Sequence, residues 1–233
     1  MSLGGDHIVK SYDVALGKLT ATIARIGGQA EAQLRGALDA LGSRDGEAAE
    51  GVVAADTQVD ALDQQVSEQA IRVLALRAPV ADDLRTVLTA LKISAELERI
   101  ADLAANIAKR SLVINQSPMV QPVRATIRMG LMVLERIKKV LDAYLARDPE
   151  VAMEVWSSDQ EVDDLYSSLF REILTYMMED PRTITPCSHL LFIAKNIERC
   201  GDHATNIAEM TYFLAKGEML RDDRPKHDTS SSV

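Results

Sequence analysis

Cysteine, aromatic residues, glycine and proline are all scarce in this chain, and these scarcities limit the class of protein. The two cysteines, Cys187 and Cys200, lack the CxxC spacing of zinc knuckles and are too few for a disulfide scaffold. Aromatic residues make up only 4% of the chain, whereas alanine, leucine, isoleucine and valine dominate, a mixture that suits packed helices better than a β-sandwich. We therefore predict an all-α protein.

The chain also lacks an excess of basic residues and any long apolar run. Its formal net charge of −9 argues against a general affinity for nucleic acid or anionic membranes, and favours cations or basic protein surfaces as partners. No apolar run reaches the length that spans a bilayer, so we expect no direct membrane insertion, and no signal peptide is visible. We expect a soluble, cytoplasmic protein.

One eleven-residue segment occurs twice. Residues Glu98–Ala108 and Glu198–Ala208 are identical at seven of eleven positions, without a gap. The repeated positions are mostly polar: a glutamate, an aspartate and an asparagine recur at intervals of four, which places three oxygen-bearing side chains in a row on one helix face. Two helices that merely shared a packing role would repeat their apolar residues, so the pattern indicates a shared chemistry.

The repeat extends over most of the chain. The segment Asp56–Asp60 returns as Asp159–Asp163 at an offset of 103 residues, and the offset is 100 by the Glu98 segment. Apolar periodicity predicts six helices, at about residues 7–41, 45–77, 80–115, 123–146, 148–179 and 186–216. The fifth helix is expected to begin with Asp148 as its N-cap and Pro149 in its first turn.

We interpret the chain as an internal duplication of an up-down-up three-helix bundle, which gives two tandem three-helix bundles. The predicted boundaries place the first bundle in residues 1–116, the second in residues 117–217 and a disordered tail in residues 218–233. Matched breaks at Pro79 and Pro181 absorb the change of offset, because the residue before a proline disfavours helix.

The repeated acids are candidate metal ligands. They lie beside and behind the apolar stripe of each helix, and like charges one turn apart cost about 0.2–0.5 kcal/mol per pair, so their recurrence predicts a compensating cation. Ligands that offer only oxygen suit Mg, Mn, Fe or Ca better than Zn or Cu. The candidates are Asp56, Asp60, Glu98, Asp102 and Asn106 in the first repeat and Asp159, Asp163, Glu198, Asp202, Asn206 and Glu209 in the second. A solvated acidic face, with Arg99 and Arg199 paired to neighbouring acids, is the alternative interpretation.

These residues resemble the PhoU family, the accessory proteins of bacterial phosphate-specific transport. The resemblance rests on the double Glu-Arg-x-x-Asp-x-Ala-x-Asn-Ile-Ala motif, on the Asp-x-x-Val-Asp-x-Leu that precedes each copy, and on the opening segment His7–Asp13. It covers about residues 7–216. The family's architecture, two tandem three-helix bundles, is the one predicted above from the repeat.

The resemblance also implies a metal cluster in each repeat. The family's acidic motif falls on Glu98 with Asp102 and on Glu198 with Asp202, and its partner pairs fall on Asp56 with Asp60 and on Asp159 with Asp163. The two copies differ in that His203 and Glu209 stand where the first copy has Leu103 and Lys109. Because a lysine near the first cluster opposes a cation, we expect the second cluster to bind metal better.

The function that the resemblance implies is regulatory, with no enzymatic activity. Similar proteins are negative regulators of phosphate uptake and of the phosphate-starvation response. They act as adaptors between the phosphate ABC transporter, through its ATPase subunit, and a sensor histidine kinase. The expected cofactors are divalent or iron-type metal ions, namely Mg, Mn or Fe, and the expected assembly is a homodimer.

Two other hypotheses come from the residues alone. The first is a carboxylate-bridged di-metal enzyme, although ferritin-like enzymes need Glu-x-x-His on two helices, whereas Glu198 and His203 are five residues apart and the first copy has Leu103. No serine triad, phosphate loop or cysteine nucleophile supports other catalysis. The second is a plain helical scaffold with solvated acidic faces, which metal analysis of the purified protein would separate from the other two.

Overall fold

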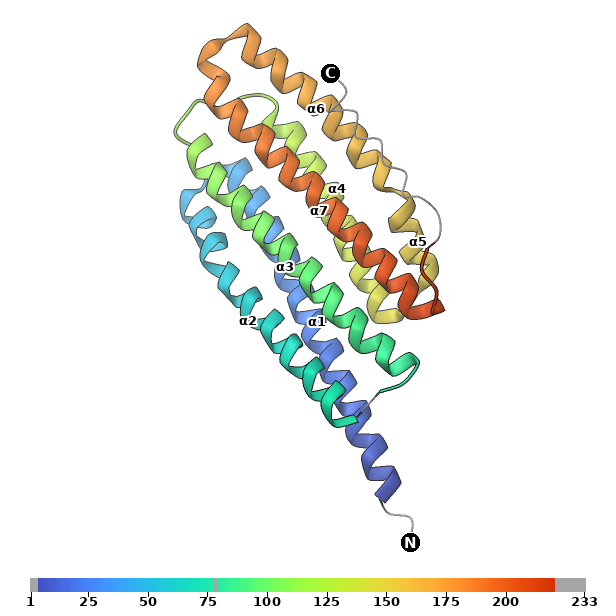
Figure 1. Cartoon of the computed structure of the whole chain (residues 1–233). Helices are drawn as coiled ribbons and strands as arrows, with labels where there is room; N and C mark the ends of the chain where they lie inside the picture. Colours follow the sequence, from blue (N-terminus) through green and yellow to red (C-terminus); the bar gives the residue numbers. More distant parts are fainter. Residues whose placement is uncertain (1–3, 78, 221–233) are drawn as a thin grey trace.

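The described part of the chain folds into two antiparallel three-helix units without a β-strand (Figure 1). The computed structural model describes the backbone of residues 4–77 and 79–220, and the side chains of residues 13–76 and 79–220. The first unit consists of α1 (Gly4–Ser43), α2 (Gly46–Arg77) and α3 (Asp82–Ile114); the second consists of α4 (Val123–Ala146), α5 (Pro149–Ser157), α6 (Asp159–Glu179), the short 3-10 helix η1 (Pro181–Thr183) and α7 (Ile184–Lys216). The predicted all-α fold of two tandem three-helix bundles is confirmed.

The two units lie side by side and share one core. Helix α3 packs along α7, and α1 packs along α4 (Figure 1). The buried residues of all seven α-helices form one continuous apolar cluster. On α3 the fully buried residues Ala101, Ala104, Ala105 and Ala108 are small, and on α7 so are Ala204 and Ala208. Such small side chains allow two helix backbones to approach closely.

The contact between α1 and α4 is reciprocal. A methyl group added at Gly27 of α1 would lie 2.6 Å from Cδ2 of Leu141 on α4, and one added at Gly130 of α4 would lie 2.5 Å from Cδ2 of Leu38 on α1. Gly130 and Leu141 stand 103 residues after Gly27 and Leu38, the offset of the repeat. Each glycine therefore forms the hole into which the other unit's leucine packs.

The turns that follow α1 and α4 also match. Arg44 and Arg147 both adopt the left-handed conformation, with φ of 60° and 53°, and both close the preceding helix. The guanidinium of Arg44 donates to the carbonyl oxygens of Asn115 and Ser117, at 2.6 and 2.7 Å, and so ties this turn to the linker after α3. Backbone details as well as sequence thus repeat between the units.

The predicted fifth helix, residues 148–179, is wrong in one respect: it is two helices, α5 and α6, that meet at Ser158. The predicted start is correct, because Asp148 accepts hydrogen bonds from the backbone N–H groups of Glu150 and Val151. At the break, the hydroxyls of Ser157 and Ser158 donate to the carbonyl oxygens of the preceding turn. Serine hydroxyls compete with the helical ladder in this way.

The predicted boundaries between the bundles and the tail stay predictions, and residues 221–233 lie outside the described part of the chain. Among the helices that the structure describes, none is long and apolar enough to cross a membrane.

Candidate metal centre

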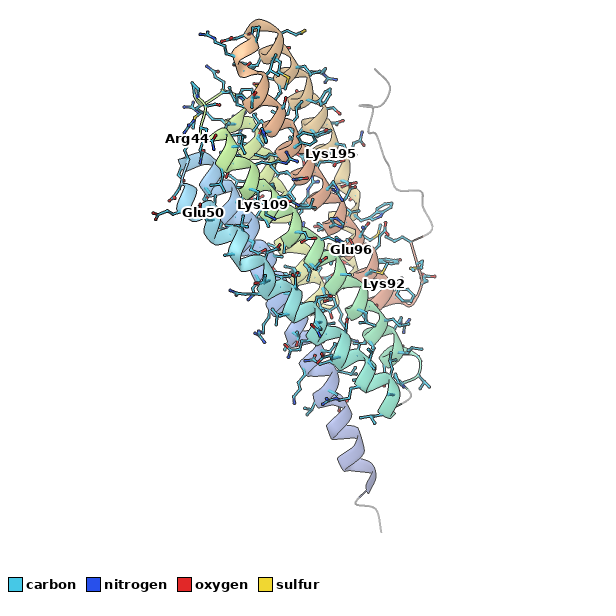
Figure 2. All side chains as sticks on the ribbon, turned by 60° about the vertical axis from the view of Figure 1, so that its left-hand side comes forward. Arg44, Glu50, Lys92, Glu96, Lys109 and Lys195 are labelled. Atoms are coloured by element: carbon cyan, nitrogen blue, oxygen red, sulfur yellow. The ribbon has the colours of Figure 1, made fainter. Side chains whose placement is uncertain are left out.

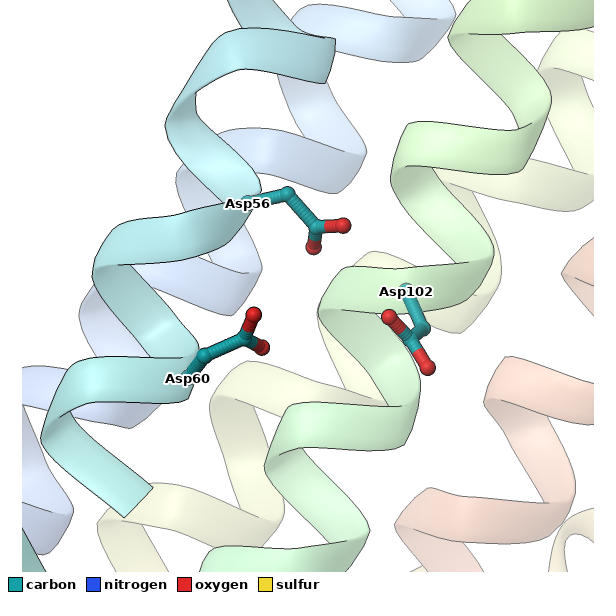
Figure 3. Close-up of side chains that lie close together, drawn as sticks. All are labelled: Asp56, Asp60 and Asp102. Carbon is teal, nitrogen blue, oxygen red and sulfur yellow. The ribbon is translucent and has the colours of Figure 1, made fainter. Parts of the chain in front are cut away.

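Three aspartates converge where α2 and α3 lie side by side. Asp56 and Asp60 lie one turn apart on α2, and Asp102 faces them from α3 (Figure 3). One carboxylate oxygen from each residue lies within 4.8 Å of the other two. Asp60 is exposed and the other two are partly buried. The structure thus brings together the α2 pair and the α3 aspartate that the sequence predicted to be neighbours.

Asp56 has an unsatisfied oxygen. Its Oδ1 atom is buried and accepts no hydrogen bond from the residues that the structure describes. A buried acceptor without a partner costs about 1–3 kcal/mol. Burial raises the pKa of the Asp56 carboxyl, the charges of Asp102 and Asp60 raise it further, and Lys109 opposes them weakly. A cation among the three carboxylates would remove both the unsatisfied oxygen and the repulsion, so these residues fit a hard metal ion.

Glu98 lies at the edge of this group. Burial raises the pKa of its carboxyl and the charge of Asp102 adds to that effect, whereas Arg99 lowers it. The Arg99 guanidinium lies 3.5 Å from Glu98 and 3.3 Å from Asp102, as the alternative interpretation proposed, but its side chain is 60% exposed. Exposed ion pairs of this kind contribute little stability. Asn106 is exposed on the next turn of α3, and its part in metal binding stays a prediction.

A further acid near this group, Asp63, was not among the predicted metal ligands. It lies on α2 three residues after Asp60, and its charge contributes to the raised pKa of Glu98. The Ser94 hydroxyl of α3 donates to Asp63 Oδ1 at 2.5 Å and so fixes the side chain. Asp63 is not a repeated acid, because the equivalent residue of the second unit is Tyr166. Its spacing from Asp60 was the signal that could have identified it.

The corresponding acids of the second unit are more deeply buried and are held by protein donors. Asp159, Asp163 and Glu198 are all buried, and Asp202 is partly buried. The Thr205 hydroxyl donates to Asp159 Oδ1 at 3.1 Å. Burial raises the pKa of the Glu198 carboxyl, and the charges of Asp202 and Asp163 add to this effect.

A lysine side chain lies against the acids of the second cluster. The Lys195 ammonium lies 2.9 Å from both carboxylate oxygens of Glu198, whose side chain is only 6% exposed. This contact lowers the pKa of Glu198, although burial outweighs it. The second cluster therefore contains a positive charge supplied by the chain.

The remaining candidates of the second unit contact other residues. His203 Nδ1 lies 2.6 Å from Oε2 of Glu96, and the Asn206 side-chain amide donates to the same oxygen at 3.0 Å. The Trp156 indole donates to Glu209 Oε1 at 3.1 Å. Stronger metal binding at the second cluster stays a prediction, and in this structure His203 and Glu209 contact Glu96 and Trp156. The His203 contact equally gives no support to a ferritin-like ligand set.

Glu96 was not predicted as a site residue, yet it connects the two units. It lies on α3 and faces α7, the helix that also carries Lys195 (Figure 2). Burial alone would raise the pKa of the Glu96 carboxyl, but the hydrogen bonds from His203 and Asn206 outweigh it and hold the pKa below its usual range. Glu96 thus remains a carboxylate that joins α3 to α7.

The PhoU domain matches this sequence twice, over residues 23–111 and 126–211. The chain belongs to the PhoU family. The two PhoU matches fall on the two three-helix units, so the duplication seen in the sequence and in the turns is a duplication of this domain.

Relatives of known name cover nearly the whole chain. The phosphate-specific transport system accessory protein PhoU homolog of Caulobacter vibrioides NA1000 is 51% identical over 227 residues, which cover 97% of this chain and 99% of the relative. The phosphate-specific transport system accessory protein PhoU of Escherichia coli K12 is 34% identical over 216 residues, which cover 92% and 89%.

Two crystal structures have the same architecture. PhoU from Pseudomonas aeruginosa aligns with a TM-score of 0.85 at 33% identity and covers 89% of this chain and all of its own, 100%. The phosphate transport system regulatory protein PhoU from Streptococcus pneumoniae aligns with a TM-score of 0.83 at 28% identity, with coverage of 90% and 99%.

Proposed function

We propose that this protein is a cytoplasmic regulator of phosphate transport that restrains phosphate uptake and the phosphate-starvation response when phosphate is plentiful. Membership of the PhoU family supports this, since its relatives are named as accessory proteins of the phosphate-specific transport system. The expected partners are the ATPase subunit of the transporter and a sensor histidine kinase, which the protein links as a homodimeric adaptor.

The observation that carries the metal-binding part of the proposal is the unsatisfied Asp56 oxygen beside Asp60 and Asp102. The three carboxylates are the ligands that Mg, Mn or iron would take, and the ion would supply the positive charge that they lack. Without it, the carboxylates of α2 and α3 repel one another; around a shared ion they hold α2 against α3. Metal binding would thereby set how firmly the first unit is held together.

The surface charge supports a protein partner with a basic docking surface. The chain carries 35 acidic and 26 basic residues. Complementary charge increases the rate at which two proteins meet and excludes partners of the same sign. The paired units provide a long acidic body for such an encounter, and salt should weaken it.

The regulatory proposal is tested by a reporter for a phosphate-starvation gene. Deletion of this protein should switch the reporter on in high phosphate, and the wild-type gene should restore repression. An Asp60→Asn, Asp102→Asn double variant should fold, because both residues lie outside the core. It should restore repression only weakly, because it lacks two of the three carboxylates of the metal cluster. Asp142→Asn, which removes an exposed acid from α4, is the matched control and should repress fully.

The outcomes separate the two parts of the proposal. A reporter that stays silent in high phosphate after deletion contradicts the regulatory role. A double variant that folds, has lost its metal and still represses fully contradicts the role of the metal cluster and leaves the adaptor surface elsewhere.

A further inference from the structure

The two carboxylate clusters differ at three paired positions. Where the second unit has Lys195 and Thr205, the first has Ala95 and Ala105, 100 residues earlier, and the Tyr166 of the second unit stands 103 residues after Asp63 of the first. All three second-unit residues contact the cluster or its lysine. The differences therefore change the chemistry of one cluster in a coordinated way.

The Lys195 ammonium is held from two sides. Its Nζ atom lies 2.9 Å from both oxygens of the buried Glu198 carboxylate, and 5.1 Å from the centre of the Tyr166 ring. The face of an aromatic ring attracts a cation at such distances. In the first unit the equivalent of Tyr166 is another acid, Asp63, and the equivalent of Lys195 has no charge. The first cluster therefore lacks both the ammonium and the aromatic ring that contacts it.

The aspartate at the start of each cluster shows the same contrast. Asp159 Oδ1 accepts a hydrogen bond from the Thr205 hydroxyl at 3.1 Å. The equivalent oxygen of the first unit, Asp56 Oδ1, is buried and unsatisfied among the described residues, and alanine stands where the threonine would be. In the second cluster the chain thus supplies a donor to Asp159 and an ammonium beside Glu198, whereas the first cluster has neither at the equivalent positions.

The formal charges of the two clusters differ in the same direction as their contacts. The first cluster has five acids, because Asp63 joins the four repeated ones, and the second has four acids and a lysine. Arg99 pairs with Glu98 and Asp102 of the first cluster, but its side chain is 60% exposed, so solvent weakens its effect on their charge. Lys109, near the first cluster, forms no ion pair with its acids among the described residues, so it does not replace Lys195 there.

We infer that the Lys195 ammonium is the built-in cation of the second cluster and excludes metal from it. Together with the metal site proposed at the first cluster, on which this part of the inference rests, it follows that the chain binds metal in only one of its two repeats. A metal ion placed among Asp163, Glu198 and Asp202 would meet the ammonium at close range, and the two cations would repel each other beside the buried Glu198 carboxylate.

The test counts metal ions bound by the full-length protein. Purified chain is treated with chelator, dialysed to equilibrium against Mn²⁺ and, without oxygen, against Fe²⁺, and the bound metal is counted by mass spectrometry. We expect about one ion per wild-type chain, lost in Asp102→Asn and kept in Asp202→Asn, and about two ions in Lys195→Ala. Lys139→Ala, which breaks the exposed ion pair of Lys139 with Glu154, should leave the count at about one.

The metal counts distinguish the exclusion of metal by Lys195 from the binding of metal at the first cluster. Two ions per wild-type chain, or a folded Lys195→Ala chain that gains none, overturns the inference. No metal in the wild type together with one ion in Lys195→Ala upholds the inference and contradicts the metal site of the first cluster. No metal in either protein contradicts both claims.

Two further variants keep the test decisive if Lys195→Ala fails to fold. Lys195→Arg retains a positive charge and should bind no additional metal. Ala95→Lys places an ammonium at the exposed equivalent position beside the first cluster and should reduce bound Mn²⁺ at least tenfold. Unchanged Mn²⁺ binding by Ala95→Lys would overturn the inference.

Discussion

Leu141 of α4 packs onto the bare backbone of Gly27 in α1, and the equivalent leucine and glycine of the two units make the same contact with the helices exchanged. The two halves of the chain therefore meet through a self-complementary surface. Because a side chain at either glycine would collide with a buried leucine, this contact is sensitive to a single methyl group.

Gly27→Ala should lower the free energy of unfolding by about 1 kcal/mol, because overpacking costs about 1–3 kcal/mol and a better helix former returns about 1 kcal/mol. Gly28→Ala is the matched control, since a methyl group there meets no described atom within 4 Å. It should stabilise the protein slightly. Urea denaturation measures both, and equal stabilities would contradict the close α1–α4 contact.

Glu96→Gln should destabilise the protein at neutral pH and much less in acid. The folded protein holds the pKa of Glu96 below its usual range, so its carboxylate stabilises the fold above the unfolded pKa and loses this effect as the pH falls through the folded pKa. Urea denaturation of both proteins at about pH 7 and about pH 4 should show the gap between them shrink. A gap that does not change with pH would mean that charge plays no part in joining α3 to α7.

Mn²⁺ should raise the melting temperature of the wild-type protein through Asp60 and its neighbours. A ligand at 100 times its dissociation constant stabilises a folded protein by about 2.7 kcal/mol. Asp60→Asn should lose most of this gain, yet be slightly more stable than the wild type in chelator, because it removes a repulsion. Asp142→Asn should behave as the wild type. A full Mn²⁺ response in Asp60→Asn would remove Asp60 from the site.

Glu209→Ala should leave metal binding unchanged and disturb the environment of Trp156. The mutation leaves a buried indole N–H without its acceptor, which costs about 1–3 kcal/mol. Trp156 is the only tryptophan, so its fluorescence maximum reports the change without interference. Loss of bound Mn²⁺ in this variant would restore Glu209 as a metal ligand.

The repeat allowed most of the fold to be predicted. The offset of 103 residues between the segments Asp56–Asp60 and Asp159–Asp163 identifies which helices correspond, and the prolines indicate where those helices end. The break at Ser158 could not be predicted in the same way. The helix around it is interrupted by hydroxyl groups that bond to the preceding turn, and serine is also tolerated within helices.

The candidate site could be predicted less completely, because periodicity gives the face of a helix and not the partner across it. Asp56 and Asp102 lie on facing sides of neighbouring helices, and it was the resemblance to the PhoU family that placed them in one cluster. The partner of His203 did not, because Glu96 lies 107 residues earlier and reaches it only through the way α3 and α7 pack. The role of Lys195 could not be predicted from the repeat, because its equivalent in the first unit is Ala95.

The reciprocal contact of Gly27 with Leu141 and of Gly130 with Leu38 gives the chain an internal two-fold axis. Such an interface is isologous, the kind by which two identical subunits pair. In a true homodimer every substitution appears on both sides of the axis at once. Here the halves are one polypeptide, so a lysine can enter one carboxylate cluster while its counterpart stays an alanine. Covalent linkage is what allows a symmetric scaffold to contain two unlike sites.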